Sequence, residues 1–354
     1  MELLTDVRDV SRIGYGFMAS KALFAALDLD VFTRLARQAS RLDELAEATA
    51  IPAKRLRTLM TALRALGLVG VGTDGRFINS PAAADFLSKS SPSYYGDYFR
   101  FQIDRQVYPH MEGLLPAMHG QAGRPFYDLA VDPDEARHFS VAQHVGSLGP
   151  AHLLSRRLGP VGWRQLLDVA GGTGAFSITL CHRNPDLTAT ILDFPKVCDV
   201  AAGYIADAGL AGRIALRRGD ARATDWPAGQ DAVIMSYLLS AVADTDIEPL
   251  LRRAYTALAP GGTLVLHDFM VTDDHAGPTS AALWLLFNVV SDPNAPQLAP
   301  GMLIQAARAA GFGDTEEFEL LPGITRAVIA NKGSNRVVLS AHIAPLLEPS
   351  SRNR

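Results

Sequence analysis

Apolar and polar positions follow two different patterns along this chain. Over roughly the first 90 residues the apolar positions recur at helical spacing, as in the segment 10–29, where Ile13, Phe17 and Leu27 share one face. From about residue 163 onward, short apolar runs alternate with helical stretches. The pattern therefore predicts an α-helical N-terminal part followed by an α/β C-terminal part.

The segment 41–80 has the pattern of a helix-turn-helix followed by a wing. A turn at 51–52 separates two helical stretches, and two short strands flank the residues 73–75. The second helical stretch carries Lys54, Arg55, Arg57 and Arg64. A DNA-reading module is one interpretation, and a winged-helix dimerisation domain is the other. The net charge of −4 favours dimerisation, because proteins that bind the phosphate backbone are usually basic.

The C-terminal part predicts a doubly wound sheet. Five strands are expected at 165–170, 188–194, 213–220, 231–238 and 262–271, the last one after a turn at 259–262, and two more at 316–321 and 324–332 form an added hairpin. A helix is expected at 303–310. Strands that alternate with helices form parallel sheets of the Rossmann-like class, which bind ligands at the carboxyl ends of their strands.

Composition narrows the class of protein. Hydrophobic residues make up 48% of the 354 residues and charged residues 20%, which is enough apolar material for a full core. The N-terminus lacks a signal-peptide pattern, and no run of about 20 apolar residues is present. The two cysteines cannot build a disulfide framework. We expect a cytoplasmic protein without membrane contact.

A glycine-rich turn follows the first strand of the α/β part. Asp168 ends that strand, and Gly171, Gly172 and Gly174 precede a helix. Glycines let the backbone approach a ligand closely, where the free N–H groups of a helix start can bind it. The spacing differs from the GxGxxG pattern of dinucleotide sites. The carboxylate of Asp168 suits an ammonium group better than a pyrophosphate.

Two further acids stand at the ends of the next strands. Asp193 ends the second, where an acid commonly accepts hydrogen bonds from ribose hydroxyls. Gly219 and Asp220 follow the third, where a carboxylate can accept from an adenine amine. Three acids around one glycine turn predict a pocket for a cationic nucleoside.

The segments LLDVAGGTGAFS, ILDFP, RRGD and ALAPGGTLVL resemble the S-adenosylmethionine-dependent methyltransferases of the caffeate and hydroxyindole O-methyltransferase type. The resemblance covers about residues 10–332, the winged helix included. It implies S-adenosylmethionine as the cofactor, a small aromatic acceptor, and a homodimer joined through the N-terminal domains. It places the cofactor against Asp168, Gly171, Gly172, Gly174, Asp193, Phe194, Gly219, Asp220, Ala221, Ser236 and Tyr237.

The resemblance also organises the chain. It predicts a winged-helix dimerisation domain at 1–90, a helical segment at 91–150 that contributes to the acceptor pocket, a methyltransferase domain at 151–335, and a C-terminal helix and tail at 336–354. Acceptor contacts are expected from Tyr98, Phe101, Arg105, Gln143, His144, Asn288 and Gln297.

The chain departs from this family where O-methylating members carry their general base. Their pattern is similar to LKWILHDWSDE, whose His takes the hydroxyl proton, whereas this chain has MSYLLSAVADTD, with Ser240 at that position. A family acid falls on Asp268, and a second falls near Gln297. A phenol with a pKa of about 10 stays protonated at pH 7, and a serine cannot remove its proton unaided.

This departure shifts the prediction toward methylation of a ring carbon ortho to the hydroxyl of a tyrosine-like amino acid, with Asp268 or His267 taking the phenolic proton near Ser240. An O-methyltransferase acting on a phenol or catechol is the alternative. Two other classes stay open: a ligand-sensing DNA-binding regulator, and a cofactor-binding protein that performs another reaction. No metal is predicted, because the spacing of His267, Asp268 and His275 fits no strong metal pattern.

Overall fold

The computed structural model describes residues 3–121 and 133–333, and of the residues 133–136 it describes the backbone only. The chain divides into two compact units, Met1–Pro109 and His110–Arg354. The division falls inside the segment 91–150 that the sequence analysis treats as one part. The expected C-terminal helix and tail at 336–354 lie outside the described residues.

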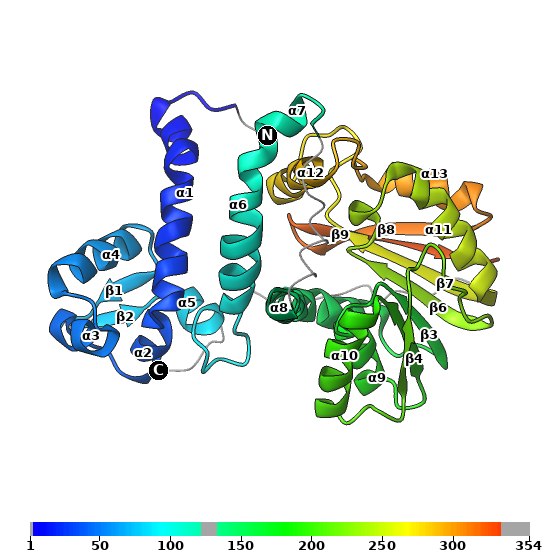
Figure 1. Ribbon diagram of the computed structural model, residues 1–354, viewed down its shortest axis with the longest axis horizontal. Helices are drawn as coiled ribbons and strands as arrows, with labels where there is room; N and C mark the ends of the chain where they lie inside the picture. The colour runs from blue at the N-terminus through cyan, green and yellow to red at the C-terminus, as the bar shows by residue number, and fades with distance from the viewer. Residues whose placement is uncertain (1–2, 122–132, 334–354) are drawn as a thin grey trace. The chain divides into compact units, whose positions relative to one another are not determined.

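The N-terminal unit contains a helix-turn-helix followed by a two-stranded wing, as predicted (Figure 1). Its elements are α1 (Val7–Asp28), α2 (Val31–Arg37), α3 (Leu42–Thr49), α4 (Ala53–Ala65), β1 (Val69–Val71), β2 (Phe77–Asn79), α5 (Pro81–Phe86) and the π-helix η1 (Tyr98–Val107). The strands β1 and β2 pair antiparallel. Leu56, Met60 and Leu63 of α4 are fully buried in the core of this unit, which explains the helical spacing of the apolar positions.

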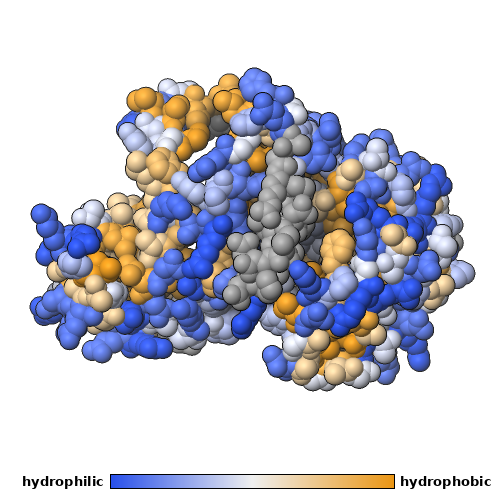
Figure 2. All heavy atoms as spheres, viewed as in Figure 1, coloured by the Kyte–Doolittle hydropathy of each residue, from blue (hydrophilic) through white to orange (hydrophobic). Residues whose placement is uncertain are grey.

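The first half of α1 exposes its apolar side chains. Asp6 caps the helix by accepting a hydrogen bond from the backbone N–H of Arg8 at 2.8 Å. The exposed apolar residues of this half of α1 and of the residues just before it are Leu3, Leu4, Val7, Val10, Ile13, Tyr15, Phe17 and Met18. Figure 2 shows orange spheres along this helix. A contiguous apolar surface of this kind marks a site of association.

The C-terminal unit is built on one sheet of seven strands in the order β5-β4-β3-β6-β7-β9-β8. Its strands are β3 (Gln165–Val169), β4 (Thr188–Asp193), β5 (Ile214–Arg218), β6 (Gln230–Ser236), β7 (Leu258–Asp268), β8 (Thr315–Leu321) and β9 (Thr325–Asn331). The strands β3 to β7 pair parallel, and β9 pairs antiparallel with β7 and with β8. This arrangement confirms the predicted doubly wound fold class with its terminal hairpin.

Helices cover both faces of this sheet (Figure 1). The helices α8 (Pro133–Leu158), α9 (Ala175–Arg183) and α10 (Pro195–Asp207) pack on one face, and α11 (Asp244–Ala257), α12 (Thr279–Ser291) and α13 (Pro300–Ala309) contribute to the core on the other. Side chains alternate between the two cores, as Leu166 and Leu167 of β3 do. Both faces of the strands are therefore buried, as the unbroken apolar runs indicate.

The short elements α6 (Tyr108–His110), η2 (Met111–Gly113), η4 (Leu239–Ala241) and α7 (Leu114–Met118) complete the described chain. The helix α12 is not evident from the sequence, because an apolar run such as 281–290 does not distinguish a buried helix from a strand by periodicity. The segment 259–262, expected to be a turn, belongs to β7, whose pairing with β6 shifts register there. Gly261 accommodates the irregularity with a φ of 80°.

Candidate functional site

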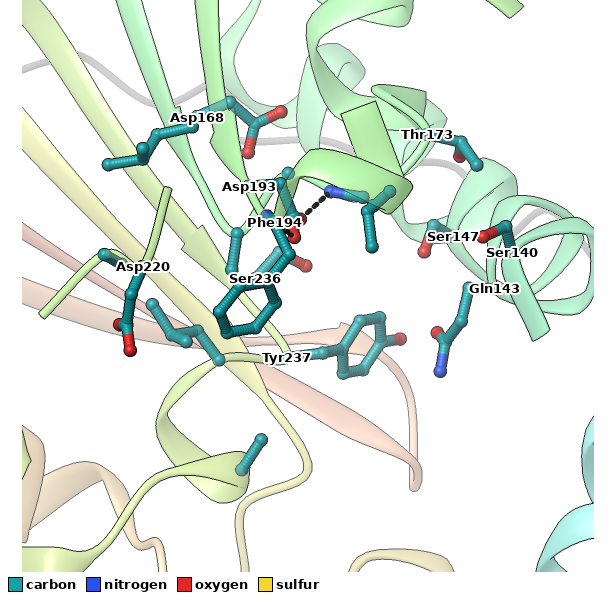
Figure 3. A pocket seen from close by; sticks show the side chains of 18 of the residues that line it. Ser140, Gln143, Ser147, Asp168, Thr173, Asp193, Phe194, Asp220, Ser236 and Tyr237 are labelled. Carbon is teal, nitrogen blue, oxygen red and sulfur yellow. Dashed lines mark hydrogen bonds between the residues drawn. The ribbon is translucent and has the colours of Figure 1, made fainter. Parts of the chain in front are cut away.

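A cavity of about 800 Å³ opens at the carboxyl ends of β3, β4, β5 and β6 in the C-terminal unit (Figure 3). Its wall consists of the segments 170–173, 192–197, 219–222 and 236–238, together with one face of α8. The direction of strand order reverses between β3 and β6, and ligands of doubly wound sheets bind at that crevice. The topology thus brings together turns that lie far apart in the sequence.

The glycine turn after β3 adopts a backbone that few residues other than glycine tolerate. Gly172 and Gly174 have φ angles of 59° and 85°, and Ala170 has 54°. A Cβ atom at Gly171 would lie 2.6 Å from the carboxyl carbon of Asp168. The turn therefore lies directly against this carboxylate, and any side chain at 171 would displace it.

Asp168 is a buried acid, and only one of its two carboxylate oxygens has a hydrogen-bond partner in the described structure. Its side chain is 1% exposed, and its Oδ2 accepts a hydrogen bond from Ser177 Oγ at 2.7 Å. Its Oδ1 is buried and has no partner in the described structure. Burial, aided by the nearby Asp193, raises the pKa of Asp168 to about 6. Because an unpartnered buried carboxylate oxygen is costly, this atom indicates a site for a cationic or N–H-bearing ligand.

Asp193 is held at the end of β4 by two backbone donors. Gly172 N donates to Oδ2 at 2.8 Å, and Phe194 N donates to Oδ1 at 2.7 Å (Figure 3). Burial raises its pKa to about 6. Phe194 follows with its side chain 51% exposed at the cavity. The hydrogen bond from Gly172 joins the end of β4 to the glycine turn after β3, so these two parts of the cavity wall are held together.

Asp220 is already paired in the cavity wall. Arg222 donates to the Asp220 carboxylate from its backbone N at 2.8 Å and from Nη2 at 2.7 Å. The Arg222 guanidinium also lies 3.5 Å from the carboxylate of Asp246. The hydrogen bond from the Arg222 side chain lowers the pKa of Asp220, which keeps the carboxylate ionised. Arg222 is a lining residue that is absent from the predicted site. Its place in the sequence, two positions after Asp220 at the end of a strand, is the signal from which this pairing could have been predicted.

Ser236 and Tyr237 line the cavity where β6 ends. In Figure 3 the Tyr237 ring points toward Gln143 of α8, which also lines the cavity. His267 lies behind them. It is 1% exposed, and its ring nitrogens are within hydrogen-bond distance of Ser236 Oγ at 2.8 Å and Thr325 Oγ1 at 2.9 Å. Burial lowers the pKa of His267 to about 3, so the ring is neutral.

Asp268, the last residue of β7, contacts Ser240 of the short 3₁₀-helix η4. Ser240 N donates to Asp268 Oδ2 at 3.1 Å, and Phe269 N donates to Oδ1 at 2.9 Å. Burial raises the pKa of Asp268 to about 6, against the opposing effect of a hydrogen bond with the Ser240 side chain and of the backbone N–H groups. The structure thus brings Ser240 and Asp268 into contact, whereas the ring of His267 contacts Ser236 and Thr325 instead. None of these three residues predicted to be catalytic is among the residues that line the described cavity.

The residues predicted to bind the acceptor lie in several places. Gln143 lines the cavity, whereas His144 contacts Thr173 Oγ1 at 2.8 Å and stacks on Tyr204 with ring centroids 4.0 Å apart. Burial lowers the pKa of His144 to about 4. Asn288 on α12 has a buried Nδ2 without a partner in the described structure, and Gln297 is exposed.

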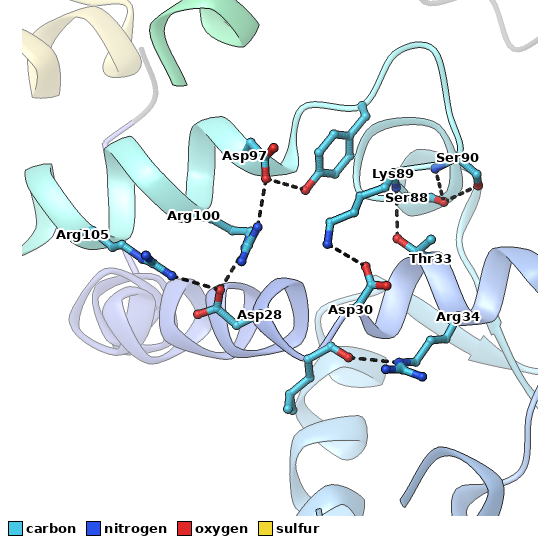
Figure 4. Close-up of polar contacts among 12 residues, drawn as sticks. Asp28, Asp30, Thr33, Arg34, Ser88, Lys89, Ser90, Asp97, Arg100 and Arg105 are labelled. Carbon is cyan, nitrogen blue, oxygen red and sulfur yellow. Dashed lines mark hydrogen bonds and ion pairs between the residues drawn. The ribbon is translucent and has the colours of Figure 1, made fainter. Parts of the chain in front are cut away.

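Tyr98, Phe101 and Arg105 belong to η1 in the N-terminal unit. Their contacts in that unit are with neighbouring residues. Figure 4 shows Arg105 beside Asp28 and Arg100. The Arg105 guanidinium lies 3.6 Å from the Asp28 carboxylate and 5.2 Å from the centre of the Phe101 ring. Arg100 donates a hydrogen bond to the same Asp28 carboxylate at 2.9 Å. Their assignment as acceptor contacts stays a prediction.

The described residues form no group of three or more His, Cys, Asp or Glu side chains that could hold a metal ion. Within the same residues, no helix is both long and apolar enough to cross a membrane. The cavity instead offers two buried carboxylates with a raised pKa and one Arg-paired carboxylate, which suits a ligand with a cationic end and several N–H or O–H donors.

Comparison with known proteins agrees with this chemistry. A family model described as an O-methyltransferase domain matches residues 104–312, and one described as an O-methyltransferase dimerisation domain matches residues 12–89. The chain is 32% identical to the 3-hydroxy-5-methyl-1-naphthoate 3-O-methyltransferase of Streptomyces sahachiroi, over 79% of this chain and 81% of that protein. It is 28% identical to the L-tyrosine C(3)-methyltransferase of Streptomyces lavendulae, over 78% of this chain and 79% of that protein.

Among solved structures, human N-acetylserotonin methyltransferase in complex with S-adenosylmethionine superposes with a TM-score of 0.81. It is 23% identical, and the match covers 94% of this chain and all of that chain. At this identity the likeness shows the fold, which is the same two-part architecture.

Proposed function

This chain belongs to the O-methyltransferase family and is an S-adenosylmethionine-dependent enzyme, and on this premise we propose that it methylates a small phenolic acceptor in the cytoplasm, as a homodimer. The related naphthoate O-methyltransferase and tyrosine C-methyltransferase both have small aromatic acceptors in their names, which supports this substrate class.

The cavity fits S-adenosylmethionine, which supplies an electrophilic methyl group on a sulfonium centre. The observation that carries this fit is the buried, unpartnered Oδ1 of Asp168 beside Gly171. Asp168 would bind the ammonium group of the cofactor. Asp193 would accept from the ribose hydroxyls, and Asp220, oriented by Arg222, would accept from the adenine amine. The chain's own contribution to rate is then mainly to hold the acceptor in line with the methyl group.

We propose ring-carbon methylation, ortho to the hydroxyl of a tyrosine-like acceptor, as the specific reaction. The ring carbon would gain the methyl group and lose its hydrogen as a proton, the hydroxyl would be retained in the product, and S-adenosylhomocysteine would be the other product. Ser240 stands where O-methylating members of the family are expected to carry a histidine base, and its backbone N–H donates to Asp268. A serine cannot take the hydroxyl proton at neutral pH, so the base that the family's O-methylation is expected to use is absent from this position. The resemblance to a tyrosine C-methyltransferase supports the same conclusion.

Of the two residues proposed to take the phenolic proton, the geometry favours Asp268. Both ring nitrogens of His267 have hydroxyl partners, and its pKa of about 3 makes it a weak base. Asp268 accepts the backbone N–H groups of Ser240 and Phe269 and is also hydrogen-bonded to the Ser240 side chain, and these contacts orient its carboxylate. Its pKa of about 6 lies near the working pH, as a general base requires. Asp268 would reach the acceptor directly or through a water.

Product analysis tests this function. Purified protein is incubated with methyl-labelled S-adenosylmethionine and, separately, with tyrosine, a hydroxylated kynurenine and a catechol, and the position of the new methyl is determined by NMR. We expect the methyl on a ring carbon. A methyl on oxygen would contradict C-methylation and support the O-methylating alternative, and labelled cofactor without any methyl transfer would indicate another reaction.

Replacing Asp193 with alanine is expected to weaken S-adenosylmethionine binding about ten- to a hundredfold, because charge-assisted hydrogen bonds to the ribose are lost. Isothermal titration calorimetry measures the affinity. Asp199→Asn is the control, since Asp199 is exposed on α10 and outside the cavity wall. Equal affinities of the wild type and Asp193→Ala would end the assignment of the ribose site.

The homodimer is expected to involve α1. Substitution of Ile13 and Phe17 with glutamate places charges on its exposed apolar surface and should convert the dimer to a monomer. Sedimentation velocity at micromolar concentration measures the outcome, with Ile324→Glu as the control, because Ile324 is an exposed apolar residue in the turn between β8 and β9. A monomeric wild type would contradict the dimer, and a dimeric double variant would exclude this face.

A further inference from the structure

His267 makes three contacts with the end of β6 from beneath the cavity wall. Its ring Nδ1 lies 2.8 Å from Ser236 Oγ, and its backbone carbonyl accepts the N–H of Tyr237 at 2.8 Å. Its ring packs edge-on against the Tyr237 ring, with centroids 4.6 Å apart. Ser236 and Tyr237 both line the cavity, whereas His267 does not. One buried residue therefore contacts two neighbouring lining residues.

The backbone at Tyr237 needs such support. Its φ of 57° lies in the left-handed region, which is unfavourable for a residue other than glycine. A conformation of this kind persists only where the surroundings over-determine it, and it is frequent at functional sites. The hydrogen bond to the His267 carbonyl and the ring contact with His267 both act on this residue. They fix where the Tyr237 ring lies in the cavity wall.

The opposite side of the His267 ring is anchored as well. Its Nε2 lies 2.9 Å from Thr325 Oγ1 on β9, and that oxygen accepts the backbone N–H of Leu321 at 3.3 Å. A neutral imidazole donates from one nitrogen and accepts at the other. Whichever tautomer is present, the Ser236 hydroxyl uses one part of its hydrogen-bonding capacity on His267 and directs the remainder elsewhere.

The position of Ser236 indicates what that remaining capacity meets. In the pairing of β3 with β6, Val169 stands opposite Met235, so Ser236 lies one residue beyond, beside Ala170 of the glycine turn. Asp168, the proposed partner of the ammonium group, also lines the cavity. The Ser236 hydroxyl thus lies at the end of the cavity where the amino-acid part of the cofactor would bind.

We propose that His267 is a positioning residue, which holds the Ser236 hydroxyl for a hydrogen bond to the amino-acid end of S-adenosylmethionine and holds the Tyr237 ring in the wall beside it. This inference rests on the proposed cofactor site. It assigns His267 a role in binding, distinct from proton transfer to or from the acceptor. Its neutral ring agrees with that role, because a group with a pKa of about 3 keeps one charge state across the working pH range.

The test is a double-mutant cycle with S-adenosylhomocysteine as the ligand, measured by calorimetry. Ser236→Ala and His267→Leu should each weaken binding about 3- to 10-fold, the usual effect of one hydrogen bond. The affinity of the double variant should lie within about twofold of that of the single variant that binds less tightly, because His267 acts through Ser236. Additive losses, or an unchanged affinity in His267→Leu, would overturn the proposal.

Thr325→Val and Thr325→Ser provide a second, milder pair of variants in case His267→Leu folds poorly. Valine removes the hydroxyl that anchors Nε2 and should weaken binding, whereas serine keeps that hydroxyl and should retain wild-type affinity. Equal affinities of the valine and serine variants would also overturn the proposal. A general structural role predicts no such rescue by serine.

Thr263→Val is the matched control. Thr263 is buried on β7, the strand that also carries His267, and it lies outside the cavity wall. Its hydroxyl donates to Asn331 Oδ1 on β9 at 3.1 Å. It should lower the melting temperature and leave the affinity unchanged. A similar loss of affinity in this control would overturn the positioning role. Failure of the wild type to bind S-adenosylhomocysteine would overturn the cofactor site together with this inference, whereas the variants test the positioning role alone.

Discussion

Asp168→Asn should weaken S-adenosylmethionine binding more than a hundredfold while leaving the ligand-free protein at least as stable at pH 7. The carboxylate is buried, and its Oδ1 has no partner in the described structure. Removing one member of a buried ion pair costs about 3–5 kcal/mol, which corresponds to a loss of more than a hundredfold in affinity. The same carboxylate is unfavourable without the ligand, because burial opposes its ionisation.

The pH dependence of stability checks this reasoning. Because burial raises the pKa of Asp168 to about 6, the folded ligand-free protein holds this proton more tightly than the unfolded chain, whose aspartates titrate near 3.8. Stability contributed by protonation is therefore fully present at low pH and is lost as the pH rises from about 4 through 6. The melting temperature of the wild type should fall over this range more than that of Asp168→Asn.

Cofactor affinity should change in the opposite direction. Below pH 6 the protonated carboxyls of Asp168 and Asp193 no longer attract the ammonium group or accept from the ribose as strongly, so the affinity of the wild type should decrease. Calorimetry from pH 5 to 8 measures this. Asp186→Asn removes an exposed acid outside the cavity wall and serves as the control. Tight binding by Asp168→Asn would contradict the assignment of the ammonium site.

Asp268→Asn should reduce turnover by roughly 10²–10⁴-fold, the usual effect of removing a general base, with less than about threefold change in cofactor affinity. The amide cannot take up the phenolic proton. Steady-state kinetics with the acceptor identified by product analysis gives kcat, and calorimetry gives the affinity for S-adenosylhomocysteine. Asp273→Asn is the matched control, because Asp273 lies a few residues after β7 and also accepts a backbone N–H, from Gly301, but is exposed.

A pH profile separates proton transfer from positioning of the turn η4. If Asp268 takes the proton, kcat of the wild type should fall as the pH decreases through about 6, where the carboxylate becomes protonated. A kcat that is flat between pH 5 and 8, combined with low turnover in Asp268→Asn, would assign this residue to holding Ser240 and Phe269. Near-normal turnover in Asp268→Asn would contradict both roles.

The sequence by itself determined the fold class and the main features of the cavity wall. Alternating apolar strands and helices specify a doubly wound sheet, because each strand must bury both of its faces. The glycine turn and the acids Asp168, Asp193 and Asp220 could be located for a related reason. Each lies at or just after the carboxyl end of a strand, and the carboxyl ends of parallel strands meet at one edge of the sheet.

The tertiary structure alone decided how these side chains are partnered. Asp220 is paired with Arg222, His144 contacts Thr173, and His267 lies behind Ser236. The same is true of the burial that brings Asp168 and Asp268 to a pKa of about 6. A pattern of apolar and polar positions places a residue on a strand or turn. Burial and hydrogen bonding depend on segments far apart in the chain, such as β7 against β6, and these come together only in the folded molecule.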